Sequence, residues 1–126
     1  MQQGFHHVAF ACRDPEATRH FYEDLLGFAL THTEVEGDDK ARMKHLFFDV
    51  GDGSSMAFFY LEGPGFPSAY PTDISTGMGL PVWVNHVAFK ADAHRKKQVA
   101  TRVLAHQSRS FRRQVTRQSR RRLGAH

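Results

Sequence analysis

Two histidines occupy the same place in a short repeated string. His7-Val8-Ala9-Phe10 returns unchanged as His86-Val87-Ala88-Phe89, at a period of 79 residues. Imidazole is a common ligand of divalent metals, and a repeated strand with a histidine at one position is typical of duplicated modules that share a site. Either histidine alone would favour a packed structural role over a ligand role. The repeat favours a metal site held by His7 and His86.

Other side chains could line a substrate pocket near these histidines. His45 falls on a predicted strand, and the sequence around it is rich in aromatic residues. Side chains alternate between the two faces of a strand, so about half of the aromatic residues should face a pocket and half should pack beneath a helix. The pocket candidates are His45, Phe47, Phe59 and Trp83, and no residue is assigned a catalytic role.

The first sixty residues predict a strand, a helix and three more strands. Asp14 can cap a helix that begins at Pro15 and runs to about Leu26, with Gly27 as its stop. A core-facing stripe is expected from Ala17, Phe21 and Leu25. The predicted strands are 5–12, 28–34, 43–50 and 55–61, and a tight Gly51-Asp52-Gly53 hairpin joins the last two.

After a linker rich in Gly and Pro, the sequence begins a second module that resembles the first. The pattern predicts a first module at 1–62, a linker at 63–82 and a partial second module at 83–107. This second module would contain a strand at Val82–Lys90 and a helix at about 94–106. Residues 108–126 hold few apolar side chains, so we expect a loose tail or an Arg-rich helix.

Charge is divided unevenly along the chain. All 13 acidic residues lie before Arg95, whereas eleven of the 17 Lys and Arg residues lie from Arg95 onward. Nucleic acid is not an expected partner, because no aromatic interleaving or known module accompanies the basic residues. The loss of all acids suggests the hypothesis that this stretch is a truncated or frame-shifted end of a longer reading frame.

Composition limits the class of protein. The 126 residues are 40% hydrophobic with eleven Phe, which is typical of one globular domain or of two half-size modules. No run of 18 apolar residues predicts a membrane span, and no secretory signal is visible, so we expect a cytoplasmic location. The single cysteine, Cys12, lies in an apolar strand and is expected to be inert.

Several ordered motifs resemble the vicinal oxygen chelate superfamily, which includes glyoxalase I, extradiol dioxygenases, bleomycin and fosfomycin resistance proteins and methylmalonyl-CoA epimerase. They are the His7–Asp14 string, Phe21-Tyr22, Leu26-Gly27-Phe28, Lys44–Gly53 and the Trp83–Phe89 string. The resemblance covers about residues 4 to 106 and implies an α+β fold of paired β-α-β-β-β modules, with the second module incomplete in this chain.

The resemblance also implies a divalent metal, Fe(II), Mn(II), Zn(II) or Ni(II), with ligands from the first and fourth strands of each module. His7 and His86 match the two first-strand ligands. Ala57 stands where glyoxalase I has a Glu, so the set resembles that of extradiol dioxygenases, whose single Glu comes from the second module. That position would fall at 136, beyond the 126 residues of this chain. Tyr60 and Glu62 are poor replacements by strand alternation and position.

Two functions therefore stay open. The first is a metal-dependent enzyme-type domain, most like an extradiol dioxygenase or a glyoxalase-family protein, acting on a small oxygen-chelating substrate. The second is an inactive or non-catalytic small-molecule-binding module that lacks the carboxylate ligand. The resemblance and the open sheet edge also favour a homodimer, in which a partner could supply the missing ligand.

Overall fold

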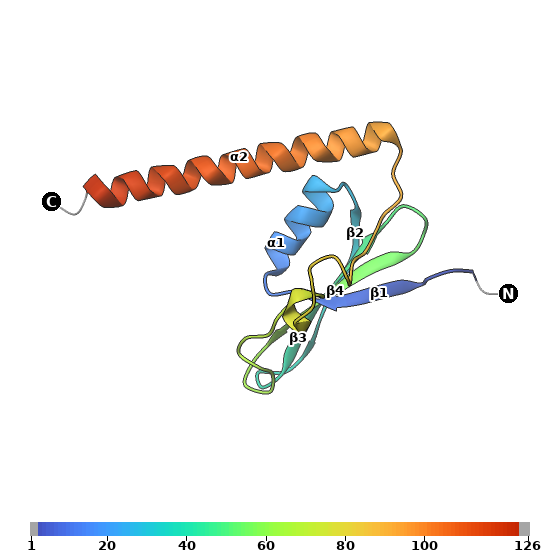
Figure 1. Ribbon diagram of the computed structural model, residues 1–126. Coiled ribbons are helices and arrows are strands. Elements are labelled where there is room, and N and C mark those ends of the chain that lie inside the picture. Colours follow the sequence, from blue (N-terminus) through green and yellow to red (C-terminus); the bar gives the residue numbers. More distant parts are fainter. Residues whose placement is uncertain (1–2, 124–126) are drawn as a thin grey trace. The chain divides into compact units, whose positions relative to one another are not determined.

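The first half of the chain folds as predicted into a β-α-β-β-β unit (Figure 1). The structure is a computed structural model that describes residues 3–123, with the backbone alone for residue 111 and residues 114–123. The elements of this unit are β1 at His7–Ala11, α1 at Pro15–Arg19, a π-helical turn η1 at His20–Leu25, β2 at Ala29–Gly37, β3 at Arg42–Asp49 and β4 at Ser55–Glu62.

The four strands form one mixed sheet in the order β1-β4-β3-β2. β1 runs parallel to β4, with His7 opposite Ser55 and Ala11 opposite Phe59. β3 is antiparallel to both of its neighbours, and its pairing with β2 is irregular between Leu30 and His32. Strand β1 therefore forms one edge of the sheet, next to the central pair β4 and β3.

The sheet has two faces of different character because side chains alternate along each strand. One face carries the buried core of Cys12, Leu46, Phe48, Met56 and Phe58, against which Tyr22 of η1 packs. We call this the helix face. The opposite face, here called the histidine face, carries by strand register His7, His45, Phe47, Ala57 and Phe59.

The first helix begins as predicted but presents a different side to the core. The Asp14 Oδ1 atom accepts a hydrogen bond from the Ala17 N–H at 3.0 Å, which confirms the cap. However, Ala17 is exposed and Phe21 is 42% exposed, so the predicted stripe through these residues is wrong. Leu25 is buried as expected, and Tyr22 takes the central core position. The π-helical turn changes the angular spacing of side chains, which an α-helical pattern does not anticipate.

Residues 63–92, which follow β4, contain no strand. Their one regular element is a short 3-10 turn, η2, at Thr76–Met78. The strand predicted at Val82–Lys90 is therefore wrong for this structure. A strand needs a neighbouring backbone for its hydrogen bonds, and here the Asn85 N–H instead donates to the Ser75 Oγ at 2.6 Å.

The last element, α2, spans Ala93–Leu123 and is much longer than the helix predicted at 94–106. Of the two forms expected for the tail, the helical one is present through Leu123, and residues 124–126 of that tail lie outside the described residues. The chain divides into a unit at Met1–Phe89 and a unit at Lys90–His126. No helix in the described part is long and apolar enough to cross a membrane.

Candidate functional site

His45 of β3 lies among aromatic rings on the histidine face. Its ring stacks on Phe59 of β4, with centroids 3.8 Å apart and an interplanar angle of 18°. Phe47, two residues along β3, also lies close to this ring, with centroids 4.2 Å apart and an interplanar angle of 52°. The His45 side chain is only 15% exposed. Two of the predicted pocket residues, Phe47 and Phe59, thus contact a third, His45.

The two nitrogens of His45 have different surroundings. Nδ1 lies 3.8 Å from the Glu34 Oε1 atom, and Nε2 is buried and has no hydrogen-bond partner within the described residues. Burial lowers the pKa of His45, and the Glu34 carboxylate opposes this shift. The ring is therefore neutral near pH 7. With its proton on the Nδ1 side, facing Glu34, its Nε2 lone pair is an unused acceptor.

His7 of β1 is close to this cluster but more open to solvent. Its ring lies edge-on to Phe47, with centroids 5.7 Å apart, and its Nδ1 forms a 2.7 Å hydrogen bond with Nδ1 of His6. The charge of His7 also lowers the pKa of His45. The histidine face thus brings together one predicted metal ligand and three predicted pocket residues.

Two polar residues on β2 were missed by the sequence reasoning. Glu34 pairs with His45 across the sheet, and His32 pairs with Phe47. The His32 Nε2 atom lies 3.2 Å from the Glu34 Oε1 atom, so the carboxylate lies between two imidazoles. Alternation along the predicted strand 28–34 put both residues on one side, and this was the signal that could have found them.

His86 does not take the position that the repeat predicted. It is exposed, and its Nδ1 lies 3.4 Å from the carbonyl oxygen of Val84. Among the described residues, no three His, Cys, Asp or Glu side chains come together in a way that could hold a metal ion. The donors that one chain brings together therefore do not fit the metal that the resemblance implies, and a shared site at His7 and His86 stays a prediction.

The fourth strand supplies no replacement carboxylate near His7. Ala57 is completely buried on the histidine face, opposite Phe47 of β3. The Glu62 Oε1 atom accepts a 2.6 Å hydrogen bond from the Arg42 Nε atom at the far end of the strand, which fixes this carboxylate in an ion pair. Tyr60 belongs to the helix face, where it packs against the core.

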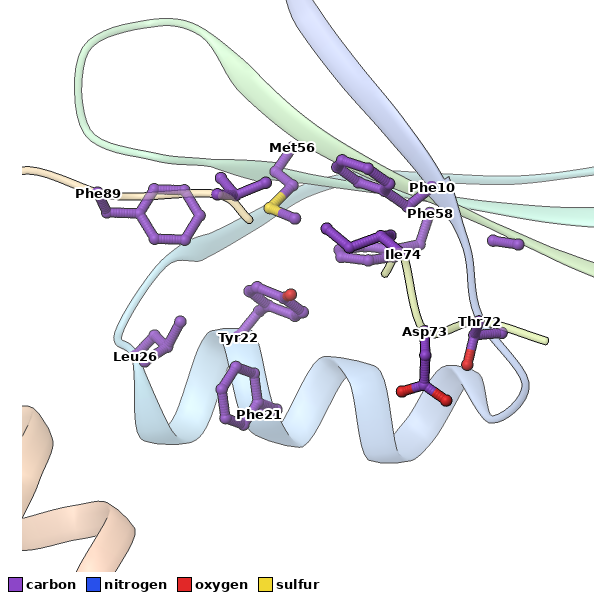
Figure 2. A pocket seen from close by; sticks show the side chains of 12 residues that line it. Phe10, Phe21, Tyr22, Leu26, Met56, Phe58, Thr72, Asp73, Ile74 and Phe89 are labelled. Carbon is purple, nitrogen blue, oxygen red and sulfur yellow. The ribbon is translucent and has the colours of Figure 1, made fainter. Parts of the chain in front are cut away.

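A cavity lies on the helix face, and His45 is not among the residues that line it. It has a volume of about 460 Å³ and opens between β1, β4, η1 and two loop segments (Figure 2). Its walls are mainly apolar, and Asp73 and Thr72 supply polar groups at one end, as Figure 2 shows. None of the predicted pocket residues lines it. Trp83 is 73% exposed and lines no described cavity, so its predicted place in a pocket is not seen.

A comparison with known families agrees with this fold. The model of the Glyoxalase/Bleomycin resistance protein/Dioxygenase superfamily matches residues 4–120. The chain belongs to this superfamily. The β-α-β-β-β unit is accordingly one glyoxalase-type module, and the α+β fold inferred from the resemblance is confirmed.

Individual relatives match only part of this chain. The Bacillus subtilis (strain 168) protein "Putative ring-cleaving dioxygenase MhqE" is 38% identical over 66 residues, which are 50% of this chain and 22% of that protein. A methylmalonyl-CoA epimerase bound to methylmalonyl-CoA and NH4+ is 35% identical and covers 47% of this chain and 42% of its own. A Streptomyces coelicolor epimerase variant bound to 2-nitronate-propionyl-CoA is also 35% identical, with 47% and 43% covered. Both superpose with a TM-score of 0.31, too low for an argument from shape.

Proposed function

We propose that this chain is a small-molecule-binding module whose ligand docks on the histidine face. The observation that carries this proposal is the buried Nε2 atom of His45, which has no hydrogen-bond partner among the described residues. A buried polar atom without a partner costs about 1–3 kcal/mol, so an arrangement that satisfies it is favoured. The rings of Phe47 and Phe59, which contact His45, offer flat apolar surface near this acceptor.

The chemistry of the face selects a class of ligand. Glu34 faces Nδ1, which leaves Nε2 to accept a hydrogen bond, so the matching ligand group is a donor such as a hydroxyl. Phe47 and Phe59 favour a planar, apolar body next to that donor. Because Nε2 is buried, a ligand can reach it only after neighbouring side chains change rotamer, and exposed side chains such as His7 on this face do so within nanoseconds. We therefore expect a planar molecule with an acidic hydroxyl.

Matched ligand pairs test this proposal. Calorimetric titration with a phenol and with its methyl ether measures how much the hydroxyl contributes to binding. For the unsubstituted chain we expect the phenol to bind roughly 2- to 10-fold more tightly, which corresponds to one neutral hydrogen bond. The variant His45→Phe keeps an aromatic ring but has no acceptor, so this preference should disappear.

His94→Phe in α2 is the matched control, because it makes the same change in an element that is not a strand of the sheet. This variant should keep the preference for the phenol. An equal preference in His45→Phe and in the unsubstituted chain would rule out His45 as the acceptor.

A second candidate function is metal-dependent chemistry of the extradiol dioxygenase or glyoxalase type. The 38% identity to the B. subtilis protein over 66 residues favours the dioxygenase form. Because one described chain does not bring three ligands together, this activity would need a homodimer partner to complete the site. Oxygen uptake with a catechol and added Fe(II), absent in His7→Ala, would support it. No uptake by the unsubstituted chain would reject it.

A further inference from the structure

The cavity on the helix face is lined by aromatic rings and by one charged group. Its aromatic lining residues are Phe10, Phe21, Tyr22, Phe58 and Phe89. Among the described residues that line it, Asp73 is the only one with a formal charge, and no Lys, Arg or His is present. Figure 2 shows Asp73 and Thr72 beside one another at one end of this lining. The cavity therefore joins an apolar interior to a single carboxylate.

The cavity is large enough for a small organic molecule and is open to solvent. Its volume of about 460 Å³ lies within the range of about 300–1,000 Å³ that is usual for ligand pockets. Two of its lining residues, Phe21 and Val87, are 42% and 40% exposed. A ligand can thus enter from solvent and cover apolar surface that is otherwise in contact with water.

Hydrogen bonds hold the loop walls of the cavity in place before any ligand binds. The Asn85 Nδ2 group joins the two loop segments, because it donates to the Ile74 carbonyl oxygen at 2.7 Å. The Tyr70 hydroxyl donates to the carbonyl oxygen of Cys12 at 2.7 Å and accepts from the Leu61 N–H at 3.0 Å, which ties the same loop to the ends of β1 and β4. A pocket that is already ordered loses less free energy when a ligand binds.

The combination of rings and carboxylate selects a cation. The faces of aromatic rings carry partial negative charge and attract cations that lie within about 6 Å of the ring centroid. The Asp73 carboxylate adds a full negative charge, and no cationic lining residue opposes it in the described chain. The unit Met1–Phe89 has the same sign, with 12 Asp and Glu residues but only five Lys and Arg residues. An anion would therefore be repelled, and an uncharged molecule would gain from apolar burial alone.

We propose that this cavity binds a small organic ammonium ion with an aromatic body. The body lies against the rings of Tyr22 and Phe58, and the ammonium group faces Asp73. These two rings are packed together with centroids 4.8 Å apart, so they form a fixed aromatic wall. The cavity belongs to the helix face, whereas His45 belongs to the histidine face. The site is thus independent of the ligand proposed for the histidine face.

Calorimetric titration with two matched ligands tests the role of charge. 2-Phenylethylammonium and the uncharged 2-phenylethanol are similar in size, so the difference in their affinities measures the contribution of the ammonium group. We expect the full chain to bind the ammonium ion roughly 5- to 10-fold more tightly, as a cation–π contact and a partly exposed ion pair together would give. Asp73→Asn should reduce this preference by at least about 2-fold, whereas Asp73→Glu, which keeps the charge, should retain it.

Asp39→Asn is the matched control, because it removes one carboxylate charge from a residue that does not line this cavity. It should leave the preference unchanged, and so should His45→Phe. Equal affinity of the full chain for the two ligands would overturn the proposal, as would the same preference in Asp73→Asn as in the full chain. Loss of ammonium binding in His45→Phe would place the ligand on the histidine face and would overturn it too.

Methyl NMR of the methionine side chains locates the bound ligand. Met56 lines the cavity and is 3% exposed, whereas Met43 does not line it and lies on the histidine face by alternation along β3. The ring current of a bound aromatic ligand shifts the signals of nearby methyl groups. Titration of the full chain with 2-phenylethylammonium should therefore shift the Met56 signal and leave the Met43 signal in place. A Met56 signal that stays in place at saturation, or an equal shift at Met43, would overturn the proposal.

Discussion

At the scale of single residues, His45 shows how a buried imidazole can be unfavourable for stability and useful for binding. Its ring contacts Phe59 and Phe47, while Nε2 is buried and has no hydrogen-bond partner in the described part of the chain. Packing against the rings compensates for part of the cost of burying the polar ring. Under the proposed function, this acceptor would give the histidine face its preference for a ligand with a donor group.

The lowered pKa of His45 predicts how stability depends on pH. The unfolded chain binds a proton at this histidine near its ordinary pKa of about 6.5, whereas the folded chain binds it only at lower pH. The unfolded state thus holds more protons in this window, and the free energy of unfolding should fall as pH drops from about 7 to about 5. Urea unfolding at several pH values measures this, and His45→Phe should have a flatter profile.

At pH 7 the same variant should be more stable by about 1–3 kcal/mol, because the buried nitrogen without a partner is removed. His94→Phe should keep the slope of the unsubstituted chain. A steeper profile in His45→Phe, or a loss of stability at pH 7, would mean that Nε2 has a favourable partner in the folded chain.

Some residues of the histidine face could be predicted from the sequence, and others could not. Alternation is a local property of strands and puts His45 and Phe47 of β3 on one side, but the sequence could not say which aromatic residues face a pocket. The register between β3 and β4 brings Phe59 to the same side. Glu34 and His32 needed the register between β2 and β3, which depends on long-range pairing and includes an irregularity. Trp83 could not be placed, because its segment is not paired in the described chain.

At the scale of elements, the start of α1 is fixed by one side chain. Asp14 Oδ1 accepts from the Ala17 N–H at 3.0 Å, and Pro15 occupies the first helical position. Asp14→Ala should therefore lower the free energy of unfolding by about 1 kcal/mol, within the usual range for a lost helix cap. Chemical denaturation measures the change. Asp39→Ala, in the turn between β2 and β3, is the control, and a similar loss there would argue against a capping effect.

Two elements show where sequence patterns fail, one in its geometry and one in its type. A helix after Asp14 was predicted correctly, but the π-helical turn at His20–Leu25 put Tyr22 rather than Phe21 against the core. The segment Val82–Lys90 has the apolar and branched residues of a strand, yet propensity alone cannot form one. Strand formation also needs a backbone partner, and this is a property of the assembly rather than of the segment.

At the scale of the whole molecule, the acidic residues and the buried core both lie in the first three quarters of the sequence, close to the boundary between the two structural units. The residues before Arg95 hold all 13 acidic side chains and the later ones hold none, and the two structural units meet at Phe89 and Lys90. Every buried side chain identified in the described residues lies between Cys12 and Ser75. The core was predictable to this extent, since its apolar strands all lie in the first half of the sequence.

This division predicts that the sheet folds without α2. A chain that ends at Asp92 keeps every buried residue identified in the structure, and it loses eleven of the 17 Lys and Arg side chains. Hydrophobic burial supplies most of the stability of a small domain, so the midpoint of thermal unfolding should change by no more than about 4–8 °C, or roughly 1 kcal/mol. Circular dichroism should show loss of helical signal with the strand signal retained. If the shortened chain were unfolded at 25 °C while the full chain is folded, α2 would have to contribute directly to the stability of the sheet.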